Sequence, residues 1–254
     1  MESESTLAAE PPLIEDDWAL FLDVDGSLAE HAPTPDAVRI DPAIKQALPA
    51  LSRKCGGALA LVSGRSVEAL DALFDPVHIA AVAGLHGLER RWHAGWNPAP
   101  AMDAGFLALA AEAEAIAARF PGALIECRGG CLFLHWRAAP DAAPELGAFA
   151  ESARTRLPHH RLHPGAHGIE IRPVGMDKGA AIAAFMQAPP FQGRRPAFIG
   201  DDPADEPGFA QVNALDGVSV LIGAARTSAA RHRLANPGAV RRWLLDSLHD
   251  EVLA

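Results

Sequence analysis

The sequence predicts an α/β protein in which a doubly wound parallel sheet carries an inserted α+β module. The sheet is indicated by short apolar segments that alternate with helix-like segments and end in turns rich in glycine or aspartate. The insert is indicated by a change of pattern, because residues 96–173 follow the order helix, hairpin, helix, hairpin. We therefore expect a core at 17–95 and 174–254, an insert at 96–173, and a flexible N-terminal tail at 1–16.

The first core segment alternates strands and helices. Residues 19–22 are apolar and stop at an Asp-Val-Asp-Gly-Ser turn, which is typical of a strand buried on both faces. Asp41 followed by Pro42 is a typical helix start, because the aspartate caps the helix and the proline fits its first position. The elements expected here are strands at 19–22, 57–62 and 78–83, helices at 42–54 and up to about 74, and a hairpin at 88–97. This order predicts right-handed crossovers.

The insert and the second core segment complete the chain. Phe106, Leu109, Ala113, Ile116 and Phe120 recur every three or four residues and give a helix one apolar face. The insert is further expected to contain strands at 123–127 and 131–137 around a Gly-Gly turn, a helix at 141–157, and strands near 161 and at 168–172. The second core segment is expected to contain a helix from 177 to 186, strands at 196–199 and 218–222, and a C-terminal amphipathic helix.

The composition is that of an ordinary globular protein. The 254 residues are 49% hydrophobic, and the net charge of −10 argues against a nucleic acid partner. No apolar run is long enough to cross a membrane, and the first ten residues are acidic where a secretory signal is basic. Three cysteines do not make a disulfide framework. We therefore expect a soluble cytoplasmic protein, a monomer or weak homodimer, with a small-molecule substrate.

Three of the predicted strands end in polar residues. They are Asp23 and Asp25 after the first strand, Ser63 and Arg65 after the second, and Asp201 and Asp202 after the strand near 198. Because the carboxyl ends of parallel strands meet at one edge of a sheet, we expect these groups in one cleft, with Lys178 at a helix start nearby. Remote segments then supply four carboxylates to one site.

Such a site favours a divalent cation. Adjacent like charges repel by about 4 kcal/mol at an effective dielectric near 20, and an all-oxygen ligand set suits Mg²⁺. A calcium loop starting at Asp23 is excluded, because its twelfth position is Thr34 where a glutamate is required. The cation would let a phosphate approach Asp23, which is placed to act as nucleophile, while Asp25 exchanges the proton. Ser63, Arg65 and Lys178 would bind the phosphoryl oxygens.

Four motifs resemble those of the haloacid dehalogenase (HAD) phosphohydrolases: DVDGS, VSGR, DKG and GDDPADE, in this order. Within that superfamily the chain is similar to the trehalose-6-phosphate phosphatases. The similarity extends to GLHG at 84–87, E-x-R at 126–128, HWR at 135–137 and GIEIRP at 168–173. The four general motifs are typical of the HAD superfamily. The shorter motifs between them are typical of the trehalose-6-phosphate phosphatases.

The resemblance implies a Rossmann-like HAD core that carries the chemistry and a mobile cap, the insert, that carries substrate specificity. It implies hydrolysis of trehalose 6-phosphate, in trehalose biosynthesis, through an aspartyl-phosphate. The implied site residues are Asp23, Asp25 and Lys178 for catalysis; Asp23, Ser27, Ser63, Arg65 and Lys178 for phosphate; Asp23, Asp25, Asp201, Asp202 and Asp205 for Mg²⁺; and Gly84, His86, Gly87, Glu126, Arg128 and Glu170 for the sugar. Three positions depart from the family pattern: Ser27 for threonine, Ala204 for threonine and Arg128 for lysine.

Several alternatives remain open at this point. The substrate could be another sugar phosphate, such as sucrose phosphate, mannosylglycerate phosphate or a hexose phosphate, and the same fold could serve as a non-catalytic phosphosugar-binding module. His86 could be a simple turn residue, and Glu126 and Glu170 could be surface charges. A zinc site at Cys127, Cys131 and His135 is disfavoured, because the Gly-Gly turn between the cysteines precludes the helix that would align them.

Overall fold

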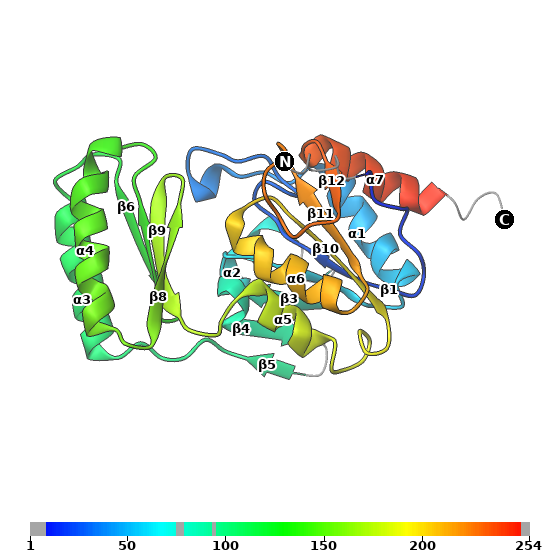
Figure 1. Cartoon of the computed structure of the whole chain (residues 1–254), viewed down its shortest axis with the longest axis horizontal. Helices are drawn as coiled ribbons and strands as arrows, with labels where there is room; N and C mark the ends of the chain where they lie inside the picture. The colour runs from blue at the N-terminus through cyan, green and yellow to red at the C-terminus, as the bar shows by residue number, and fades with distance from the viewer. Residues whose placement is uncertain (1–8, 75–78, 93–94, 250–254) are drawn as a thin grey trace, which may run out of the picture. The chain divides into compact units, whose positions relative to one another are not determined.

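The computed structural model describes residues 9–74, 79–92 and 95–249 (Figure 1). Contacts divide the chain into two compact units, Met1–Trp96 with Asp177–Ala254, and Asn97–Met176. We call them the core unit and the inserted unit. The boundaries predicted from the sequence lie after residues 95 and 173. No helix in the described part of the chain is long and apolar enough to span a bilayer.

The core unit is built on an eight-stranded sheet with the order β12-β11-β10-β1-β2-β3-β4-β5. The strands are β1 (Trp18–Leu22), β2 (Leu59–Val62), β3 (Ala81–Gly84), β4 (Glu89–Trp92), β5 (Gly95–Asn97), β10 (Arg195–Gly200), β11 (Val218–Ile222) and β12 (His232–Leu234). From β12 to β3 all neighbours are parallel, and β4 pairs antiparallel with β3. This confirms the predicted wound α/β fold. The chain winds in opposite directions from β1 and β10, so their boundary is the switch point where such sheets bind ligands.

Helices cover both faces of this sheet (Figure 1). They are α1 (Pro42–Lys54), α2 (Val67–Leu73), α5 (Lys178–Phe185), α6 (Glu206–Ala214) and α7 (Pro237–His249), with short 3₁₀ helices η1 (Pro35–Ala37), η2 (Leu85–Gly87) and η4 (Pro203–Asp205). Helix α1 packs with α7, and α5 packs with α6. Every residue of β1, β2 and β11 is buried, which explains why these strands are apolar except for Ser219 in β11.

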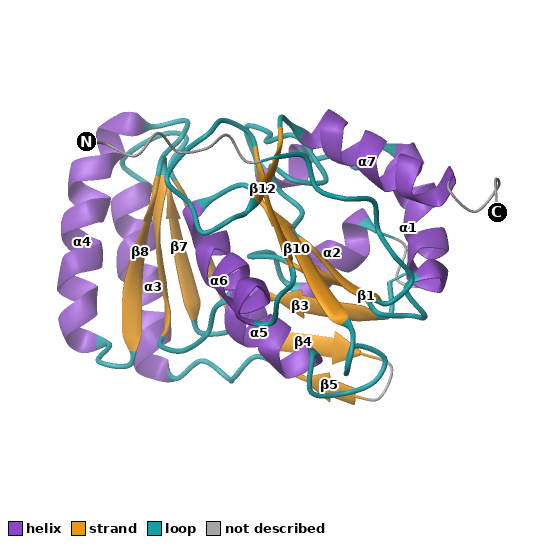
Figure 2. Cartoon of the chain, turned by 45° about the vertical axis from the view of Figure 1, so that its right-hand side comes forward, coloured by secondary structure: helices purple, strands orange, loops and turns teal. Residues whose placement is uncertain are grey.

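The inserted unit is a four-stranded antiparallel sheet with two helices on one face (Figure 2). Its elements are α3 (Ala104–Ala117), β6 (Leu124–Arg128), β7 (Cys131–His135), η3 (Pro140–Ala142), α4 (Ala143–Arg156), β8 (His160–Gly165) and β9 (Gly168–Pro173), with the strand order β6-β7-β9-β8. The apolar cluster beneath the helices includes Phe106, Leu109, Leu132, Leu134 and Ile171. Alternation along β6 and β9 therefore places Glu126, Arg128, Glu170 and Arg172 on the opposite face.

The structure differs from the sequence-based expectations in three places. Residues 9–16 are not a flexible tail, because the amide of Ile14 donates to Ser247 Oγ at 3.1 Å and the indole of Trp243 donates to the carbonyl of Pro12 at 2.9 Å. The sequence analysis also assigned no element to α6 or β12. The predicted start of the third strand at residue 78, and the turn of the 88–97 hairpin at 93–94, lie outside the described residues.

Candidate active site

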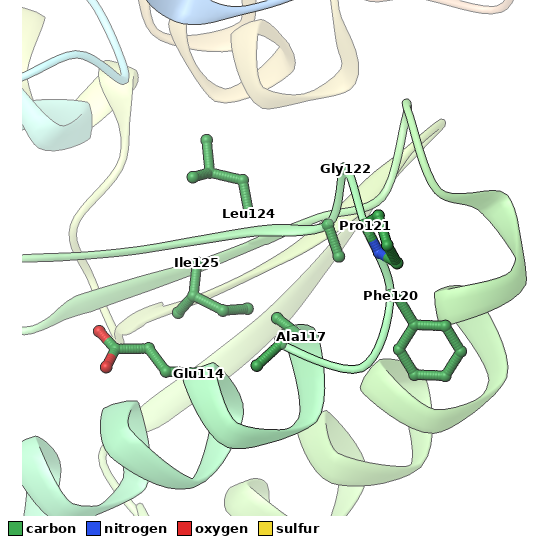
Figure 3. Close-up of a pocket in the computed structure, with 9 residues that line it drawn as sticks. Glu114, Ala117, Phe120, Pro121, Gly122, Leu124 and Ile125 are labelled. Atoms are coloured by element: carbon green, nitrogen blue, oxygen red, sulfur yellow. The ribbon is translucent and has the colours of Figure 1, made fainter.

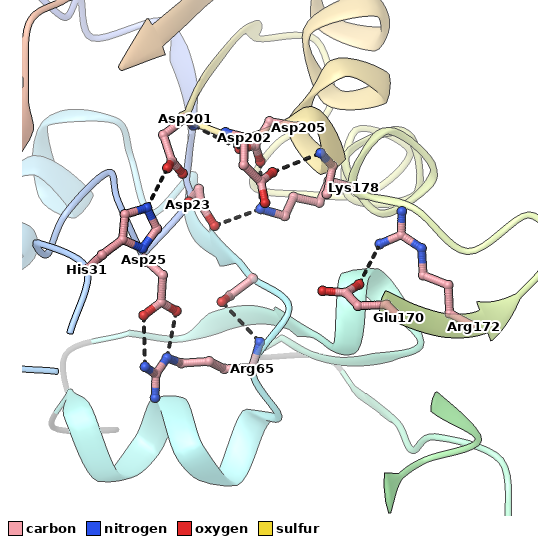
Figure 4. A network of polar contacts seen from close by, with 12 residues as sticks. Asp23, Asp25, His31, Arg65, Glu170, Arg172, Lys178, Asp201, Asp202 and Asp205 are labelled. Carbon is pink, nitrogen blue, oxygen red and sulfur yellow. Dashed lines mark hydrogen bonds and ion pairs between the residues drawn. The ribbon is translucent and has the colours of Figure 1, made fainter. Parts of the chain in front are cut away.

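Three strand ends lie side by side at one edge of the core sheet. Strand β1 lies between β10 and β2, and all three run parallel. Asp23 follows β1, Ser63 follows β2 and Asp201 follows β10. The polar turns that the sequence analysis grouped from distant parts of the chain are thus neighbours in the fold (Figure 4).

Lys178 joins two carboxylates at this edge. Its Nζ donates to Asp23 Oδ1 at 2.7 Å and to Asp205 Oδ1 at 2.6 Å. Lys178 is the first residue of α5, capped by the Asp177 side chain, which accepts from the amide of Ala180. A cation at a helix N-terminus is unfavourable by itself, so the two carboxylates offset that penalty. All three charged side chains are buried, with at most 4% of any of them exposed.

Burial changes the protonation of these groups. Loss of solvent raises the pKa of Asp23 well above its ordinary value, because desolvation outweighs Lys178 and because Asp205 and Asp201 add repulsion. Burial likewise raises the pKa of Asp205 to about 7. For Lys178 burial acts downward, but the attraction of Asp205 and Asp23 outweighs it and raises its pKa. One ammonium thus only partly compensates the buried carboxylates, and a further cation would favour their ionised form.

The acidic loop after β10 is shaped by its own side chains. Asp205 Oδ2 accepts from the amides of Asp201 and Asp202 at 2.9 and 3.0 Å, and the Asp202 side chain accepts from the amide of Ala204 at 2.8 Å. With Oδ1 bound to Lys178, both oxygens of Asp205 are engaged. Asp205 and Asp202 therefore fix the loop, and Asp23 and Asp201 are the better candidates for direct cation ligands.

The residues present fit a hard divalent cation. Asp23, Asp201 and Asp205 each offer a carboxylate oxygen, and these oxygens lie within 4.8 Å of one another. The set is all oxygen and partly uncompensated, as Mg²⁺ sites are. Gly26 shapes it as well: its φ is +81°, and a Cβ there would lie 2.0 Å from Asp201 Oδ2, so only glycine allows Asp201 to approach the turn.

Asp25 and Arg65 form a two-point ion pair. Arg65 Nε donates to Asp25 Oδ2 at 2.6 Å, and Arg65 Nη2 donates to Asp25 Oδ1 at 2.8 Å and to the carbonyl of Pro35 at 3.0 Å. The sequence analysis assigned Arg65 to phosphoryl oxygens and did not foresee this pair. A guanidinium binds a carboxylate through two parallel bonds, so the pair fixes the orientation of Asp25. The Ser63 hydroxyl accepts from the amide of Arg65 at 3.2 Å.

Ser27 contributes a hydroxyl to the turn after β1. The residue is fully buried, and within the described residues its Oγ has no hydrogen-bond partner. A buried hydroxyl without a partner is destabilising, and such groups in native proteins call for an explanation. An anionic oxygen bound at this turn would supply the missing acceptor.

The Gly-Leu-His-Gly turn after β3 packs against the segment after β2. The amide of Leu85 donates to the carbonyl of Arg65 at 2.8 Å, and the amide of His86 donates to the carbonyl of Ser63 at 2.9 Å. Leu85 and His86 adopt left-handed backbone angles, with φ of 49° and 55°. His86 is only 3% exposed, so it is a turn residue but not a solvated one. Gly84 and Gly87 flank it, at the end of β3 and the end of η2.

The sugar-binding residues expected on the insert share one sheet face. Glu126 pairs with Phe133, and Phe133 pairs with Glu170, across β6, β7 and β9. Arg128 Nε lies 3.9 Å from Glu126 Oε2, and Arg172 donates to Glu170 Oε2 at 3.4 Å. These carboxylates and guanidinium groups offer both acceptors and donors on the face away from the helices.

The inserted unit has two other features to consider, a possible zinc site and an apolar pocket, and neither contains the predicted sugar-binding residues. Cys127 packs in the cluster under the helices, whereas the strand alternation places Cys131 and His135 on the other face, which contradicts a shared zinc site. A pocket between the end of α3 and β6 is lined mainly by apolar side chains, including Phe120, Leu124 and Ile125 (Figure 3). It contains none of the predicted site residues.

The sequence analysis missed two residues that contact the acidic loop. His31 Nε2 lies 2.9 Å from Asp201 Oδ2, and Arg226 Nη2 donates to the carbonyl of Asp202 at 2.9 Å. Both come from irregular connections in which no periodicity or motif indicates a partner. No feature of the sequence could have identified either contact.

The chain is similar in sequence to known proteins. Residues 21–237 match the sequence profile of a family described as trehalose-phosphatase. The chain is 47% identical over 209 residues to a "Probable trehalose-phosphate phosphatase" of Sinorhizobium fredii, covering 82% of this chain and 78% of that protein. It is 43% identical over 236 residues to the trehalose-6-phosphate phosphatase of Escherichia coli, covering 92% and 88%.

Solved structures share the fold. The C-terminal domain of Candida albicans trehalose-6-phosphate phosphatase superimposes with a TM-score of 0.81 at 19% identity, over 92% of this chain and 93% of that one. A haloacid dehalogenase-like hydrolase from Bacteroides thetaiotaomicron gives a TM-score of 0.67 at 14% identity, over 89% and 98%. At these identities the likeness extends to the fold alone.

Proposed function

This chain belongs to the trehalose-phosphatase family, and from that premise we propose that it is a Mg²⁺-dependent phosphatase that hydrolyses trehalose 6-phosphate to trehalose and phosphate. The observation that carries the proposal is the buried cluster at the switch point, in which Lys178 contacts Asp23, 155 residues away in the chain, and Asp205. A structural ion pair does not require two buried carboxylates around one ammonium beside a third carboxylate, Asp201. Such an arrangement suits phosphoryl transfer, in which a cation and a lysine offset the charge of the carboxylates and of the phosphate.

Asp23 is the proposed nucleophile. Lys178 holds its Oδ1, which leaves Oδ2 to attack phosphorus in line with the departing sugar oxygen. The bond from phosphorus to the sugar oxygen breaks as the bond from Asp23 forms, and an aspartyl-phosphate results. Since burial raises the pKa of Asp23, positive charge nearby is needed to keep it ionised.

The cation would be held by Asp23 and Asp201, while Asp202 and Asp205 shape the loop. The family resemblance adds the backbone carbonyl of Asp25 as a third ligand. When bound, Mg²⁺ would supply positive charge that offsets the repulsion between a phosphate dianion and the carboxylates. The ammonium group of Lys178 likewise supplies positive charge next to Asp23.

Asp25 is the proposed acid and base. In its protonated form it gives a proton to the departing sugar oxygen, and as a carboxylate it then takes a proton from the water that attacks the aspartyl-phosphate. Inorganic phosphate leaves, and both aspartates return to their starting state. Both oxygens of Asp25 accept from Arg65, so one of these bonds would open when Asp25 carries the proton.

The phosphoryl oxygens are proposed to bind Ser27, Ser63, Arg65 and Lys178. Ser27 is supported by its buried hydroxyl, which an anionic oxygen would satisfy. For the disaccharide we propose Glu126, Arg128 and Glu170, together with the turn at Gly84, His86 and Gly87. Carboxylate and guanidinium groups in one row can accept from and donate to the hydroxyl groups of a sugar.

A phosphate-release panel tests this function. The purified protein with Mg²⁺ is given trehalose 6-phosphate, sucrose 6-phosphate, mannosylglycerate phosphate and glucose 6-phosphate at matched concentrations. We expect the highest kcat/KM for trehalose 6-phosphate. Faster turnover of another sugar phosphate would refute the substrate assignment, and binding without phosphate release would favour the non-catalytic module.

A further inference from the structure

Arg226 contacts the backbone of the acidic loop from a different part of the core unit. It lies in the connection between β11 and β12, and its Nη2 donates to the carbonyl oxygen of Asp202 at 2.9 Å and to that of Asp201 at 3.5 Å. These carbonyl groups follow directly on the Cα atoms that carry the acidic side chains. The position of the guanidinium group therefore bears on where the Asp201 carboxylate points.

Arg226 is itself held in place. Its Nη1 donates to the Glu206 carboxylate and to the carbonyl of Thr227, the latter at 3.1 Å. The other oxygen of Glu206 accepts from the amide of Ala229 at 2.8 Å. Glu206 begins α6, where a carboxylate is favoured by the helix dipole. Both side chains are about 70% buried, with 29% and 28% exposed, so their charge-assisted bonds are partly shielded from water.

The two sides of the acidic loop are held by different groups. Its amides at Asp201 and Asp202 donate to Asp205, and its carbonyls accept from Arg226. Asp201 also lies tightly against the turn after β1, because a Cβ on Gly26 would come within 2.0 Å of its Oδ2. A small displacement of the loop would therefore shift the Asp201 carboxylate relative to Asp23.

We propose that Arg226 is a positioning residue that sets the affinity of the acidic site for its divalent cation by holding Asp201. The inference rests on the proposed function in one respect, that this site binds such a cation. Mg²⁺ requires near-octahedral geometry with ligands at about 2.1 Å, so a modest displacement of one carboxylate weakens binding. Loss of a group that orients a metal ligand typically lowers metal affinity about 10- to 100-fold.

The test measures cation binding directly. Calorimetric titration of the full chain with Mn²⁺, without substrate, is compared for the wild type, Arg226→Gln and Arg226→Lys. Arg231→Gln is the matched control, because Arg231 lies in the same connection and is exposed, and among the described residues its guanidinium donates one long bond, of 3.5 Å, to the carbonyl of Asn213. We expect Mn²⁺ affinity to fall about tenfold in Arg226→Gln, less in Arg226→Lys, which keeps the charge, and not at all in Arg231→Gln.

A second readout separates positioning from general damage. In Arg226→Gln the Mg²⁺ concentration that gives half-maximal phosphate release should rise, while kcat at saturating Mg²⁺ and KM for trehalose 6-phosphate stay within about twofold of the wild type. An unchanged Mn²⁺ affinity, an equal loss in Arg231→Gln, or a fall in kcat that Mg²⁺ does not restore would overturn the proposal. If Arg226→Gln does not fold, Arg226→Lys carries the same comparison.

The two proposals fail in different ways. A wild-type protein that binds Mn²⁺ at this site but releases no phosphate from trehalose 6-phosphate would refute the substrate assignment and leave the affinity comparison valid. A wild-type protein that binds no Mn²⁺ would refute the role of Arg226.

Discussion

Replacing Lys178 with methionine should test the buried cluster most severely. Methionine keeps most of the apolar side chain but removes the ammonium group that Asp23 and Asp205 share. Both contacts are shorter than 3 Å, and Asp23 and Asp205 are almost wholly buried, so the carboxylates would lose their shared counter-charge without gaining water. They would also repel each other more strongly.

The size of the effect follows from these contacts. A unit charge pair at about 4 Å and an effective dielectric near 20 gains about 4 kcal/mol, and the desolvation of Lys178 offsets part of the two attractions. Breaking a buried ion pair by removing one partner typically costs about 3–5 kcal/mol. We expect Lys178→Met to lose that amount of unfolding free energy at pH 8 in the presence of chelator.

The loss should shrink at lower pH. Burial raises the pKa of Asp205 to about 7 and that of Asp23 in the same direction, even with Lys178 present. At pH 5 the Asp205 carboxyl of the variant would be protonated and would need no counter-charge. Mg²⁺ should recover part of the loss at pH 8, because the cation replaces the missing charge.

Urea denaturation followed by tryptophan fluorescence measures these differences. Lys45→Met is the matched control, since Lys45 is exposed on α1 and the same substitution there should change stability by less than about 0.5 kcal/mol. If Lys178→Met unfolds at the same urea concentration as the wild type at pH 8, or loses equal stability at pH 5 and pH 8, the account of the cluster is wrong.

Three further predictions concern catalysis, the sugar and pH. Asp23→Asn should abolish phosphate release while trehalose 6-phosphate still raises the melting temperature; measurable turnover would refute Asp23 as nucleophile. Arg128→Ala should raise KM about ten- to hundredfold with little change in kcat, and an unchanged KM in steady-state kinetics would remove Arg128 from the sugar site. The folded-state pKa of Asp205, about 7, is raised above its ordinary 3.8, so its contribution to stability is complete below pH 3.8 and is lost as pH rises through 7. The melting temperature in chelator should therefore fall between pH 5 and pH 8, and a flat profile would contradict the shift.

The sequence predicted the parts of the fold that depend on local pattern. The strands β1, β2 and β11 were found because burial on both faces makes them apolar, with Ser219 in β11 as the exception. The caps at Asp41 and Asp177 were found because an aspartate before a helix binds its free amides, as both do here. These features need no knowledge of distant residues.

The missed features depend on distant contacts or on weak local pattern. Helix α6 has Pro207 and Gly208 near its start, and β12 is a three-residue strand with the sequence His-Arg-Leu. The N-terminal residues 9–16 dock through Pro12 and Ile14 onto α7, which lies at the other end of the chain. The periodicity of the sequence does not indicate such a contact between distant segments.

The candidate site was also predicted only in part from the sequence. The sequence indicated which acidic turns meet at the sheet edge, because parallel strands share the direction of their ends. It did not indicate how the charges pair once they meet. Arg65 and Arg226 each have several possible partners near the site. That Arg65 binds Asp25 and Arg226 binds the acidic loop is seen only in the three-dimensional structure.

The need for a cation can be measured as phosphate release from trehalose 6-phosphate before chelation, after chelation, and after Mg²⁺ is added back. Turnover should stop when the divalent cation is removed and return when Mg²⁺ is restored, because the carboxylates at Asp23 and Asp201 need a cation to admit a phosphate. Turnover that continues at full rate in excess chelator would contradict it.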